Sequence, residues 1–282
     1  MLRALAASAA CLAAALLAPA PAAADLLDDI LARGEIRIAV RDDAPPLSYL
    51  GEDGVHQGYS VAICRVLADR LAGQLGRPGL GRVLVPVTAE NRFEAVAEGR
   101  ADLLCGAASV TLSRREIVDF SIPTFVDGAA VMTREDGPQS IEALAGERIG
   151  VRAGTTTEES LRLTLSARGI EAEIVAIESH PDGVADLRAG RLDAYIADQS
   201  ILYGLAAVAG TDGLRTSENT LTLEPHALAM PRGETRMRLE VDRALSRMWR
   251  DGTMNRVFDE AFAPAQPGEA LRALSALAPI LE

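Results

Sequence analysis

The sequence contains no lysine, because all 28 of its basic residues are arginine. Catalysis through a lysine Schiff base and cofactors anchored on a lysine are therefore excluded. Histidine is also scarce: a three-histidine zinc site would need all three histidines, and no metal-ligand spacing is visible. We therefore expect neither a metal ion nor a cofactor.

Positive charge is outnumbered by negative charge. The 28 arginines stand against 40 acidic residues, which gives a formal net charge of −12. Surfaces that bind nucleic acid need an excess of positive charge. The balance therefore argues against a nucleic-acid partner.

Long hydrophobic runs are absent beyond the N-terminus, so we expect no membrane span there. The apolar run at residues 4–17 follows a short basic start with Arg3 and precedes the small residues 22–24. This pattern is typical of a secretory signal peptide. We predict that residues 1–24 are removed by cleavage after Ala24. A lipoprotein signal at Cys11 is the alternative, but Ser8 stands where that signal needs leucine.

Only two cysteines, Cys64 and Cys105, remain after this cleavage. In an oxidising compartment an even pair is compatible with one disulfide. The alternative is two buried free thiols, which behave as small hydrophobic groups. The residues alone leave both possibilities open.

Helical and extended patterns alternate along the chain, which favours an α/β fold. Strands are expected at residues 36–40, 82–87, 103–105, 148–151, 172–177 and 192–197. Helices are expected at 25–33, from a cap at Ser60 to about 75, and at 91–98, 141–145, 181–188, 199–209 and 269–277. The loop at 153–159 should open a helix that runs to about 168, and a helix from 235 to about 262 should be interrupted at Gly252. Two longer extended runs, 123–133 and 221–230, are suited to carry the chain from one lobe to another and back.

A short sequence pattern that occurs twice supports two similar lobes. Residues 97–102 and 188–193 each combine a helix end, a glycine, an Arg-x-Asp sequence and a following apolar strand. Two lobes joined by two crossings would place the ends of these strands face to face. The alternative is that such helix–glycine–strand units are common in any α/β protein.

Arg114 is the leading candidate for a ligand-binding residue. It ends a Thr-x-x-Arg turn beyond the apolar strand at 103–105. An arginine at that position points into the crevice where open α/β sheets bind ligands. Its planar guanidinium matches a carboxylate. The alternative is a surface arginine, which is what we expect of Arg115.

Four further residues complete a site with the shape of an amino acid. Thr155 and Thr156 precede a helix whose free N–H groups suit a carboxylate, although ordinary capping is the alternative. Ser109 adds a hydroxyl before Arg114. Asp198 follows an apolar strand, where it would pair with an ammonium group or cap the next helix. No nucleophile–base pair is visible, which argues against an enzyme.

Together these residues resemble the family 3 periplasmic solute-binding proteins, which serve polar amino-acid ABC importers. The matching segments are Gly34 to Val40, Pro46 to Tyr49, Gly58 to Ser60, Gly99 to Asp102, Thr111 to Arg114, Asp119 to Ser121, Leu144 to Gly146, Gly154 to Thr156, and Gly190 to Asp198. The resemblance implies the type II periplasmic binding fold, with the ligand in a cleft between two α/β lobes joined by a two-strand hinge. The implied lobes are residues 25–130 with 226–264, and 131–225, followed by a tail at 265–282.

The resemblance is closer to the glutamate/aspartate type. Arg41, Asn91 with Arg92, Cys105 with Gly106, and His180 stand where those proteins carry the same residues. The residues alone favour a solvated loop position for His180. The implied roles are Arg114, Ser109, Thr155 and Thr156 for the α-carboxylate, Arg41, Arg92 and His180 for the side-chain carboxylate, and Asp198 for the α-amine.

Some positions depart from that type. Ala89 and Ala107 replace serines that face the ligand side chain, and Ala62 replaces an aspartate at a helix start. Ala44 stands where basic-amino-acid binders present an aromatic ring. The resemblance therefore implies a monomeric periplasmic protein that binds an acidic or polar amino acid and docks on an ABC permease. A cyclohexadienyl-dehydratase-like enzyme and a ligand-sensing partner of a membrane receptor are the alternatives.

Overall fold

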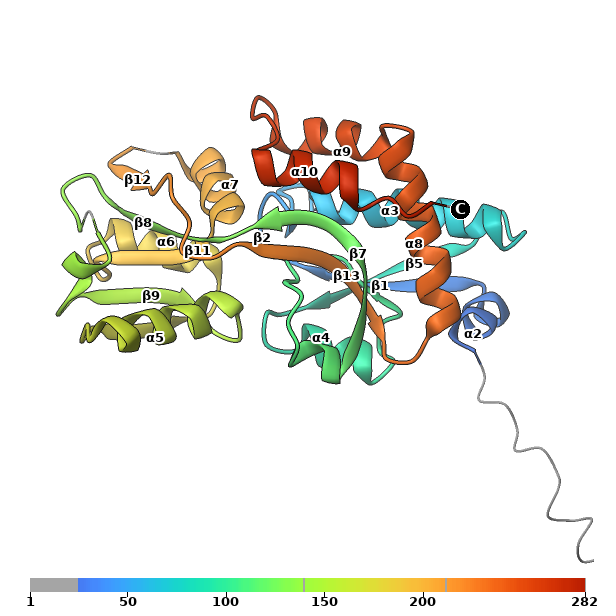
Figure 1. Cartoon of the computed structure of the whole chain (residues 1–282), viewed down its shortest axis with the longest axis horizontal. Coiled ribbons are helices and arrows are strands. Elements are labelled where there is room, and N and C mark those ends of the chain that lie inside the picture. The colour runs from blue at the N-terminus through green and yellow to red at the C-terminus, as the bar shows by residue number, and fades with distance from the viewer. Residues whose placement is uncertain (1–24, 139, 211, 282) are drawn as a thin grey trace, which may run out of the picture.

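The computed structural model describes residues 25–138, 140–210 and 212–281. The predicted signal peptide lies outside the described residues, so its cleavage after Ala24 stays a prediction. The described chain forms two α/β lobes that lie side by side (Figure 1). None of the described helices combines the length and the apolar composition that a membrane crossing requires.

The first lobe is built on a five-stranded sheet with the strand order β5-β1-β6-β13-β7. β1 pairs in parallel with β5 and β6, whereas β13 runs antiparallel to β6 and β7. The strands are β1 (Glu35–Arg41), β5 (Gly81–Val87), β6 (Leu103–Leu104), β7 (Val118–Asp127) and β13 (Glu224–Pro231). The helices around this sheet are α2 (Leu26–Arg33), α3 (Tyr59–Gln74), α4 (Arg92–Ala97), α8 (Thr235–Arg250), α9 (Thr253–Phe262) and α10 (Glu269–Leu277).

The second lobe has its own five-stranded sheet with the order β10-β9-β11-β8-β12. β9 pairs in parallel with β10 and β11, which repeats the arrangement around β1. The strands are β8 (Ala129–Arg134), β9 (Arg148–Arg152), β10 (Glu173–Ile177), β11 (Ala194–Asp198) and β12 (Leu214–Thr216). The helices are α5 (Thr156–Arg168), α6 (His180–Arg188) and α7 (Gln199–Ala209), and a 3-10 turn at Glu142–Leu144 takes the place of the helix predicted at 141–145.

Two stretches of chain connect the lobes. β7 ends at Asp127 and β8 begins at Ala129, so Gly128 alone separates a strand of the first sheet from a strand of the second. The chain returns from β12 to β13, and Figure 1 shows β7 and β13 side by side between the lobes. This architecture confirms the predicted fold class.

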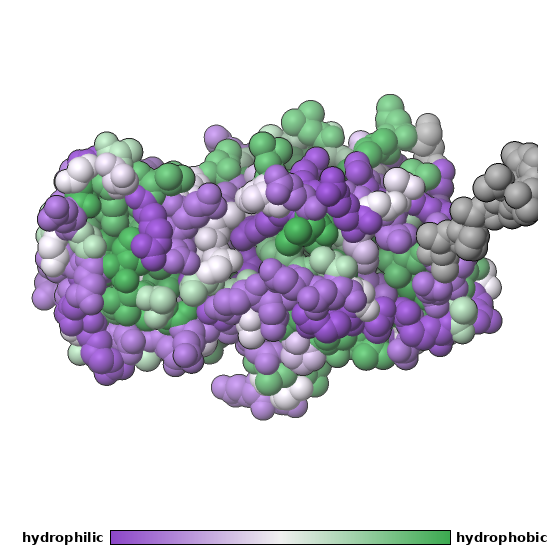
Figure 2. All heavy atoms as spheres, turned by 90° about the horizontal axis from the view of Figure 1, so that it is seen from below, coloured by the Kyte–Doolittle hydropathy of each residue, from purple (hydrophilic) through white to green (hydrophobic). Residues whose placement is uncertain are grey.

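Polar residues cover most of the right-hand lobe in the view from below, whereas a band of hydrophobic residues shows on the left-hand lobe (Figure 2).

The pattern repeated at residues 97–102 and 188–193 has a structural explanation. In the first lobe the carboxylate of Asp102 accepts hydrogen bonds from the backbone N–H and the guanidinium of Arg37, both at 2.7 Å. In the second lobe Asp193 accepts the same two bonds from Arg148, both at 3.1 Å. In each lobe an aspartate therefore ties a central strand to its parallel neighbour.

The start of α3 differs from the prediction. Its N-cap is Gly58, and no side chain caps the helix. Ser60, the predicted cap, donates its hydroxyl hydrogen bond to the Gly106 carbonyl at 3.4 Å. A side chain at position 58 is not tolerated, because a Cβ there would lie 2.6 Å from the Pro46 carbonyl oxygen.

A disulfide joins Cys64 on α3 to Cys105, directly after β6, with the two Cα atoms 6.3 Å apart. Both cysteines are buried. The bond anchors the segment that runs from β6 to Ala107 and Ser109, two residues that face the space between the lobes.

A third, three-stranded sheet lies in a segment where the sequence predicted neither a strand nor a helix. Its strands are β2 (Asp43–Ala44), β3 (Ser48–Leu50) and β4 (His56–Gln57). Strands of two or three residues are too short to show an alternating pattern. The sheet holds the end of β1 in place, because the hydroxyl of Ser48 accepts a hydrogen bond from the Arg41 backbone N–H at 2.8 Å.

Candidate ligand-binding site

A small cavity of about 10 Å³ lies between the two lobes. Its walls are formed by the ends of β1, β9 and β11 and by the starts of α4, α5 and α6, where open α/β sheets bind ligands. We call it the inner cavity. Its lining residues are Arg41, Arg92, Ala107 and Ser109 from the first lobe, and Arg152, Thr155, Thr156, Thr157, His180, Ile196, Ala197, Asp198 and Ile201 from the second. All predicted site residues except Arg114 line it.

One end of the inner cavity holds two arginines at equivalent positions. Arg41 ends β1, Arg152 ends β9, and both are buried. Arg41 donates to Oδ1 of Asp43 through Nε at 2.9 Å and Nη2 at 2.6 Å, while Arg152 donates to Oδ2 through Nε at 3.2 Å. Arg152 also pairs with Glu90. Two carboxylates of the protein therefore neutralise these two guanidinium groups.

Asp43 remains a carboxylate in this position. Burial raises its pKa, but the charge of Arg41, its hydrogen bonds and the charge of Arg152 outweigh burial, and the net pKa is lowered. The first lobe supplies Asp43 and the second supplies Arg152, so the ion pair crosses the space between the lobes.

Arg92, at the start of α4, has too little negative charge around it. Its side chain is buried, Nη1 donates to the Gly154 carbonyl at 3.5 Å, and Nε has no hydrogen-bond partner. Burial lowers its pKa, and the positive charges of Arg114 and Arg41 lower it further. Because a guanidinium stays protonated in proteins, an anionic group in the cavity would stabilise it.

His180 is buried, in contrast to the solvated position that the residues alone suggest. Burial lowers its pKa to about 3, and the charge of Arg41 adds to this effect, so the ring is neutral. Its Nδ1 lies 2.8 Å from the Tyr195 hydroxyl, and Nε2 has no partner. We assign the hydroxyl as donor to Nδ1, which leaves the proton on Nε2. Nε2 is then an N–H donor for an oxygen of the ligand.

Arg114 lies just outside the lining of the inner cavity. The threonine of the Thr-x-x-Arg sequence holds the turn, because the Arg114 backbone N–H donates to the Thr111 hydroxyl at 3.1 Å. The arginine then begins a 3-10 turn at Arg114–Glu116. This turn fixes the backbone from which the side chain extends.

The guanidinium of Arg114 is held against the edge of the cavity. It lies 4.6 Å from the centre of the Phe93 ring, and Nη1 donates to the Ser109 carbonyl at 2.8 Å. Burial lowers the pKa of Arg114, whereas the charges of Glu224 and Asp198 raise it. The group makes no other side-chain hydrogen bond to a described residue, so its remaining N–H groups are available to a carboxylate.

Thr155 caps α5, which was the alternative to direct binding of a carboxylate by this loop. Its hydroxyl accepts a hydrogen bond from the Glu158 backbone N–H at 3.2 Å and donates to the Arg152 carbonyl at 2.7 Å. The hydroxyl is therefore engaged within α5. The N–H groups of Thr156 and Thr157, which precede Glu158 in the first helical turn, have no intrahelical partner and can still bind an anion.

Thr156 and Ser109 bring the two lobes into contact. Their hydroxyl oxygens lie 3.1 Å apart. Thr156 also donates to the Glu224 carboxylate at 2.6 Å, and Thr222 donates to the same group at 2.7 Å. Burial raises the pKa of Glu224, but hydrogen bonds from these hydroxyls outweigh burial and the net pKa is lowered. Glu224 is thus an ionised neighbour of the predicted α-carboxylate position.

Asp198 occupies the N-cap position of α7 but makes no cap hydrogen bond with its side chain. Its Oδ1 accepts from the Thr157 hydroxyl at 3.2 Å, and its Oδ2 lies 3.6 Å from Nε2 of His226. The capping alternative is therefore wrong for this carboxylate. Asp198 instead lines the inner cavity.

Asp127 and His226 stand beside Asp198. Burial raises the pKa of Asp127 to about 8, and the charge of Asp198 adds to the effect. His226 is buried, both of its ring nitrogens lack a hydrogen-bond partner, and burial lowers its pKa. The three residues each offer one ligand atom within 4.8 Å of the others. An ammonium group and a metal ion are the two kinds of cation that such a set accepts.

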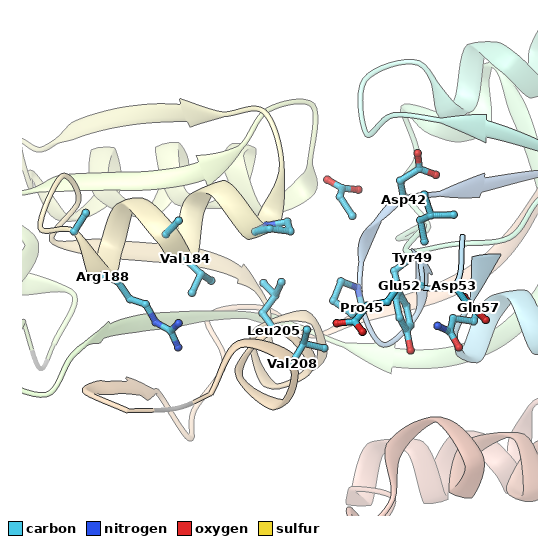
Figure 3. A pocket seen from close by; sticks show the side chains of 16 residues that line it. Asp42, Pro45, Tyr49, Glu52, Asp53, Gln57, Val184, Arg188, Leu205 and Val208 are labelled. Carbon is cyan, nitrogen blue, oxygen red and sulfur yellow. The ribbon is translucent and has the colours of Figure 1, made fainter. Parts of the chain in front are cut away.

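A larger outer cavity of about 950 Å³ lies beside Asp43. Figure 3 shows its two sides: Val184 and Arg188 of α6 with Leu205 and Val208 of α7 on one, and Asp42, Pro45, Tyr49, Glu52, Asp53 and Gln57 on the other. Asp43 also lines it, while the carboxylate of Asp43 bonds the arginines of the inner cavity. Asp43 therefore stands between the two cavities.

Several residues that the structure brings to the site were not predicted from the sequence. They are Asp43, Glu90, Asp127, Arg152, Thr157, Glu224 and His226. For Arg152 a signal existed, since it follows an apolar strand just as Arg41 does. For Asp43 and Glu90 the sequence held no such signal, because their contacts with Arg152 join segments that lie far apart in the sequence.

Comparison with known proteins agrees with this architecture. Residues 36–264 match the model of the bacterial extracellular solute-binding proteins, family 3. The chain is 27% identical over 264 residues to an L-glutamate/L-aspartate-binding protein of Pseudomonas aeruginosa, with 91% of this chain and 87% of that protein covered. It is 25% identical over 241 residues to an L-cystine-binding protein of Escherichia coli, with 84% and 86% covered.

Solved structures show the same fold. An ancestral amino-acid-binding protein, described as a precursor of cyclohexadienyl dehydratase, superposes with a TM-score of 0.73 at 25% identity. The match covers 85% of this chain and all of that chain. Two α/β lobes around a buried cavity rich in N–H donors are the architecture of a solute-binding protein. The chain belongs to family 3 of the bacterial extracellular solute-binding proteins, and its predicted likeness to the glutamate/aspartate type is confirmed.

Proposed function

We propose that this protein binds one free amino acid with an acidic or polar side chain and delivers it to the permease of an ABC importer. One observation carries the proposal. Two buried N–H donors without a partner, Nε of Arg92 and Nε2 of His180, belong to residues that line a closed cavity between the lobes. Leaving a buried donor unpaired costs about 1–3 kcal/mol, so a ligand that supplies acceptors there is favoured.

The α-carboxylate and the α-ammonium of the ligand have separate partners. Arg114, Ser109 and the first-turn N–H groups that begin with Thr156 offer donors to the carboxylate. Asp198 offers an acceptor to the ammonium, with Asp127 beside it. An amino acid carries both of these charges on one carbon atom, a combination that few other small solutes match.

Arg92 and His180 face the side chain of the ligand in this proposal. Both groups donate, so they suit the carboxylate of glutamate or aspartate and also a side-chain amide oxygen. Ala107 lines the same cavity without a hydroxyl, which leaves fewer contacts for the side chain. Relatives bind L-glutamate and L-aspartate in one case and L-cystine in another, so we assign an acidic or polar amino acid as the class.

Export and docking complete the proposal. The predicted signal peptide would place the mature chain in the periplasm, and the two-lobed fold suits closure around the ligand before docking on a membrane permease. We propose that the protein acts as a monomer without a metal or a cofactor.

A dehydratase is the second candidate, favoured by one observation. The buried carboxyl of Asp127, with its pKa raised to about 8, is protonated at neutral pH and stands beside the site, which is how a general acid is poised. Turnover of prephenate or arogenate by the purified protein would establish this activity. We favour binding, because Asp198 together with the arginines of the site fits a free amino acid better.

A thermal-shift and calorimetry screen of all amino acids tests the proposal. The mature chain is unfolded and refolded first, so that co-purified ligand is removed. We expect stabilisation by glutamate, aspartate, glutamine or asparagine, because a ligand at 100 times its Kd adds about 2.7 kcal/mol to the free energy of unfolding. Stabilisation by no amino acid would contradict the proposal.

A further inference from the structure

The ion pair between Asp43 and Arg152 lies at one end of the inner cavity, where a carboxylate on the ligand side chain would otherwise bind the arginines. Asp43 belongs to the first lobe and Arg152 to the second, and Asp43 also holds Arg41. The side chains of Arg41 and Arg152 are only 1% and 5% exposed. Bulk water and salt therefore screen these charges weakly, and the state of Asp43 acts directly on the charge of the inner cavity.

The charges around this ion pair can be followed residue by residue. Glu90 is the second carboxylate on Arg152. The neighbouring Asp42 turns away, because its carboxylate lies 2.7 Å from Nε2 of His56 and its side chain is 53% exposed. His180 is neutral. Arg92 is thus the guanidinium of the inner cavity that has no carboxylate of the protein bonded to it.

We propose that Asp43 is a specificity-determining residue that decides how strongly the site prefers an acidic side chain over its amide. Its carboxylate bonds Arg41 and Arg152 and holds the lobes together at this end, so the ligand does not have to supply a carboxylate there. Glutamine can then be accepted beside glutamate, because Arg92 and Nε2 of His180 donate to either kind of oxygen. The inference rests on the proposed function, since it concerns the side chain of that ligand.

Removing the charge of Asp43 should make binding depend on a carboxylate in the ligand side chain. In Asp43→Asn, Arg41 and Arg152 lose their shared counter-ion, and closure at this end depends on a carboxylate from the ligand. Removing the charge of Arg152 should act in the opposite direction. In Arg152→Gln, Asp43 is balanced by Arg41 alone, and the cavity becomes less favourable for an anionic side chain.

Calorimetry with glutamate and glutamine tests this on the mature wild-type chain, Asp43→Asn, Arg152→Gln and the control Asp42→Asn. The quantity compared is the ratio of the two Kd values within each protein. We expect the preference for glutamate to rise at least about tenfold in Asp43→Asn and to fall at least about tenfold in Arg152→Gln. It should stay within about twofold of the wild type in Asp42→Asn. Opposite shifts from the two partners of one ion pair are not produced by a general loss of stability.

Several outcomes would overturn the inference. Equal changes for both ligands in Asp43→Asn, shifts in the same direction in both ion-pair variants, or a shift in Asp42→Asn as large as in Asp43→Asn each contradict it. So does a wild type that binds glutamate but not glutamine. Circular dichroism checks the fold of each variant, and if Asp43→Asn does not fold, the direction of the shift in Arg152→Gln decides. A wild type that binds no amino acid contradicts the proposed function itself.

Discussion

The hydroxyl of Tyr195 lies 2.8 Å from Nδ1 of His180, and with the hydroxyl assigned as the donor the proton of the buried imidazole lies on Nε2. Tyr195 is fully buried, and its ring packs so closely on α6 that a Cβ at Gly183 would lie 2.2 Å from it. The hydroxyl is therefore fixed in place. It sets Nε2 of His180 as a donor toward the ligand.

Tyr195→Phe should weaken the binding of glutamate about tenfold. Without the hydroxyl, the proton can move to Nδ1 and leave a lone pair on Nε2 facing an oxygen of the ligand. Calorimetry measures the loss, and the ¹⁵N shifts of the imidazole report the tautomer. Tyr203→Phe is the matched control, because the side chain of Tyr203 is 50% exposed. Unchanged affinity together with an unchanged tautomer would contradict the role given to Tyr195.

Gly204 on α7 sets how closely the lobes approach. A Cβ at this position would lie 2.5 Å from the Pro45 carbonyl oxygen of the first lobe. Gly204→Ala should therefore hinder closure and weaken the binding of every amino acid about 10- to 100-fold. Small-angle scattering should show a smaller decrease in radius of gyration when ligand is added.

Gly268→Ala is the control for Gly204→Ala. Gly268 has a φ of −65°, and no heavy atom lies within 4 Å of the Cβ position. Its substitution should leave ligand binding unchanged. Equal affinities in the two variants would show that the contact between Gly204 and Pro45 does not limit closure.

The buried carboxyl of Asp127 should make stability fall as pH rises from about 4 to about 8. Its pKa is raised to about 8 in the folded protein, compared with about 4 in an unfolded chain. The folded state then binds more protons than the unfolded state between these values, so the free energy of unfolding decreases with rising pH. His180, with its pKa lowered to about 3, acts in the opposite direction, but only below about pH 6.5.

Between pH 6.5 and 8 we therefore expect the free energy of unfolding to fall by about 1–2 kcal/mol through Asp127. Asp127→Asn should remove this decrease, and Asp69→Asn, at an exposed position, should retain it. Urea unfolding at a series of pH values measures both. A wild-type stability that rises over this interval would contradict the assignment of a protonated carboxyl.

The disulfide between Cys64 and Cys105 closes a loop with a sequence separation of 41 residues. Replacing both cysteines with serine should lower the free energy of unfolding by about 2–4 kcal/mol, because the unfolded chain gains freedom. Dithiothreitol should produce a similar loss in the wild type and none in the double variant. A loss in the double variant caused by dithiothreitol would show that the reagent acts elsewhere.

Much of the fold followed from local patterns. The alternation of helices and strands and the two long crossings were visible in the sequence, because periodicity and composition reflect burial of whole elements. The sheet β2-β3-β4 was missed, because its strands are too short to show a period. Ser60 was chosen as a cap from its residue type, but the tight packing of Gly58 against Pro46 determined the helix start.

The site was predicted less completely than the fold. Strand-end positions pointed to Arg114 and Asp198, and the resemblance added Arg41, Arg92 and His180. What could not be predicted is how these charges are balanced. That Asp43 bonds Arg41 and Arg152 depends on contacts between the lobes, and no local pattern records such contacts.

Arg114 remains the residue on which the proposed function depends most. Its guanidinium is held by Phe93 and the Ser109 carbonyl with the other N–H groups available to a ligand carboxylate. Every amino acid has that carboxylate, so a loss at Arg114 should not depend on the ligand side chain. The exposed neighbour Arg115 provides a matched control.

Calorimetry of Arg114→Ala with glutamate and glutamine is the most direct measurement. We predict that both ligands bind at least about 100-fold more weakly than to the wild type, since losing one partner of a buried charge pair costs about 3–5 kcal/mol. Arg115→Ala should bind both ligands as the wild type does. Affinity near that of the wild type in Arg114→Ala would contradict the account.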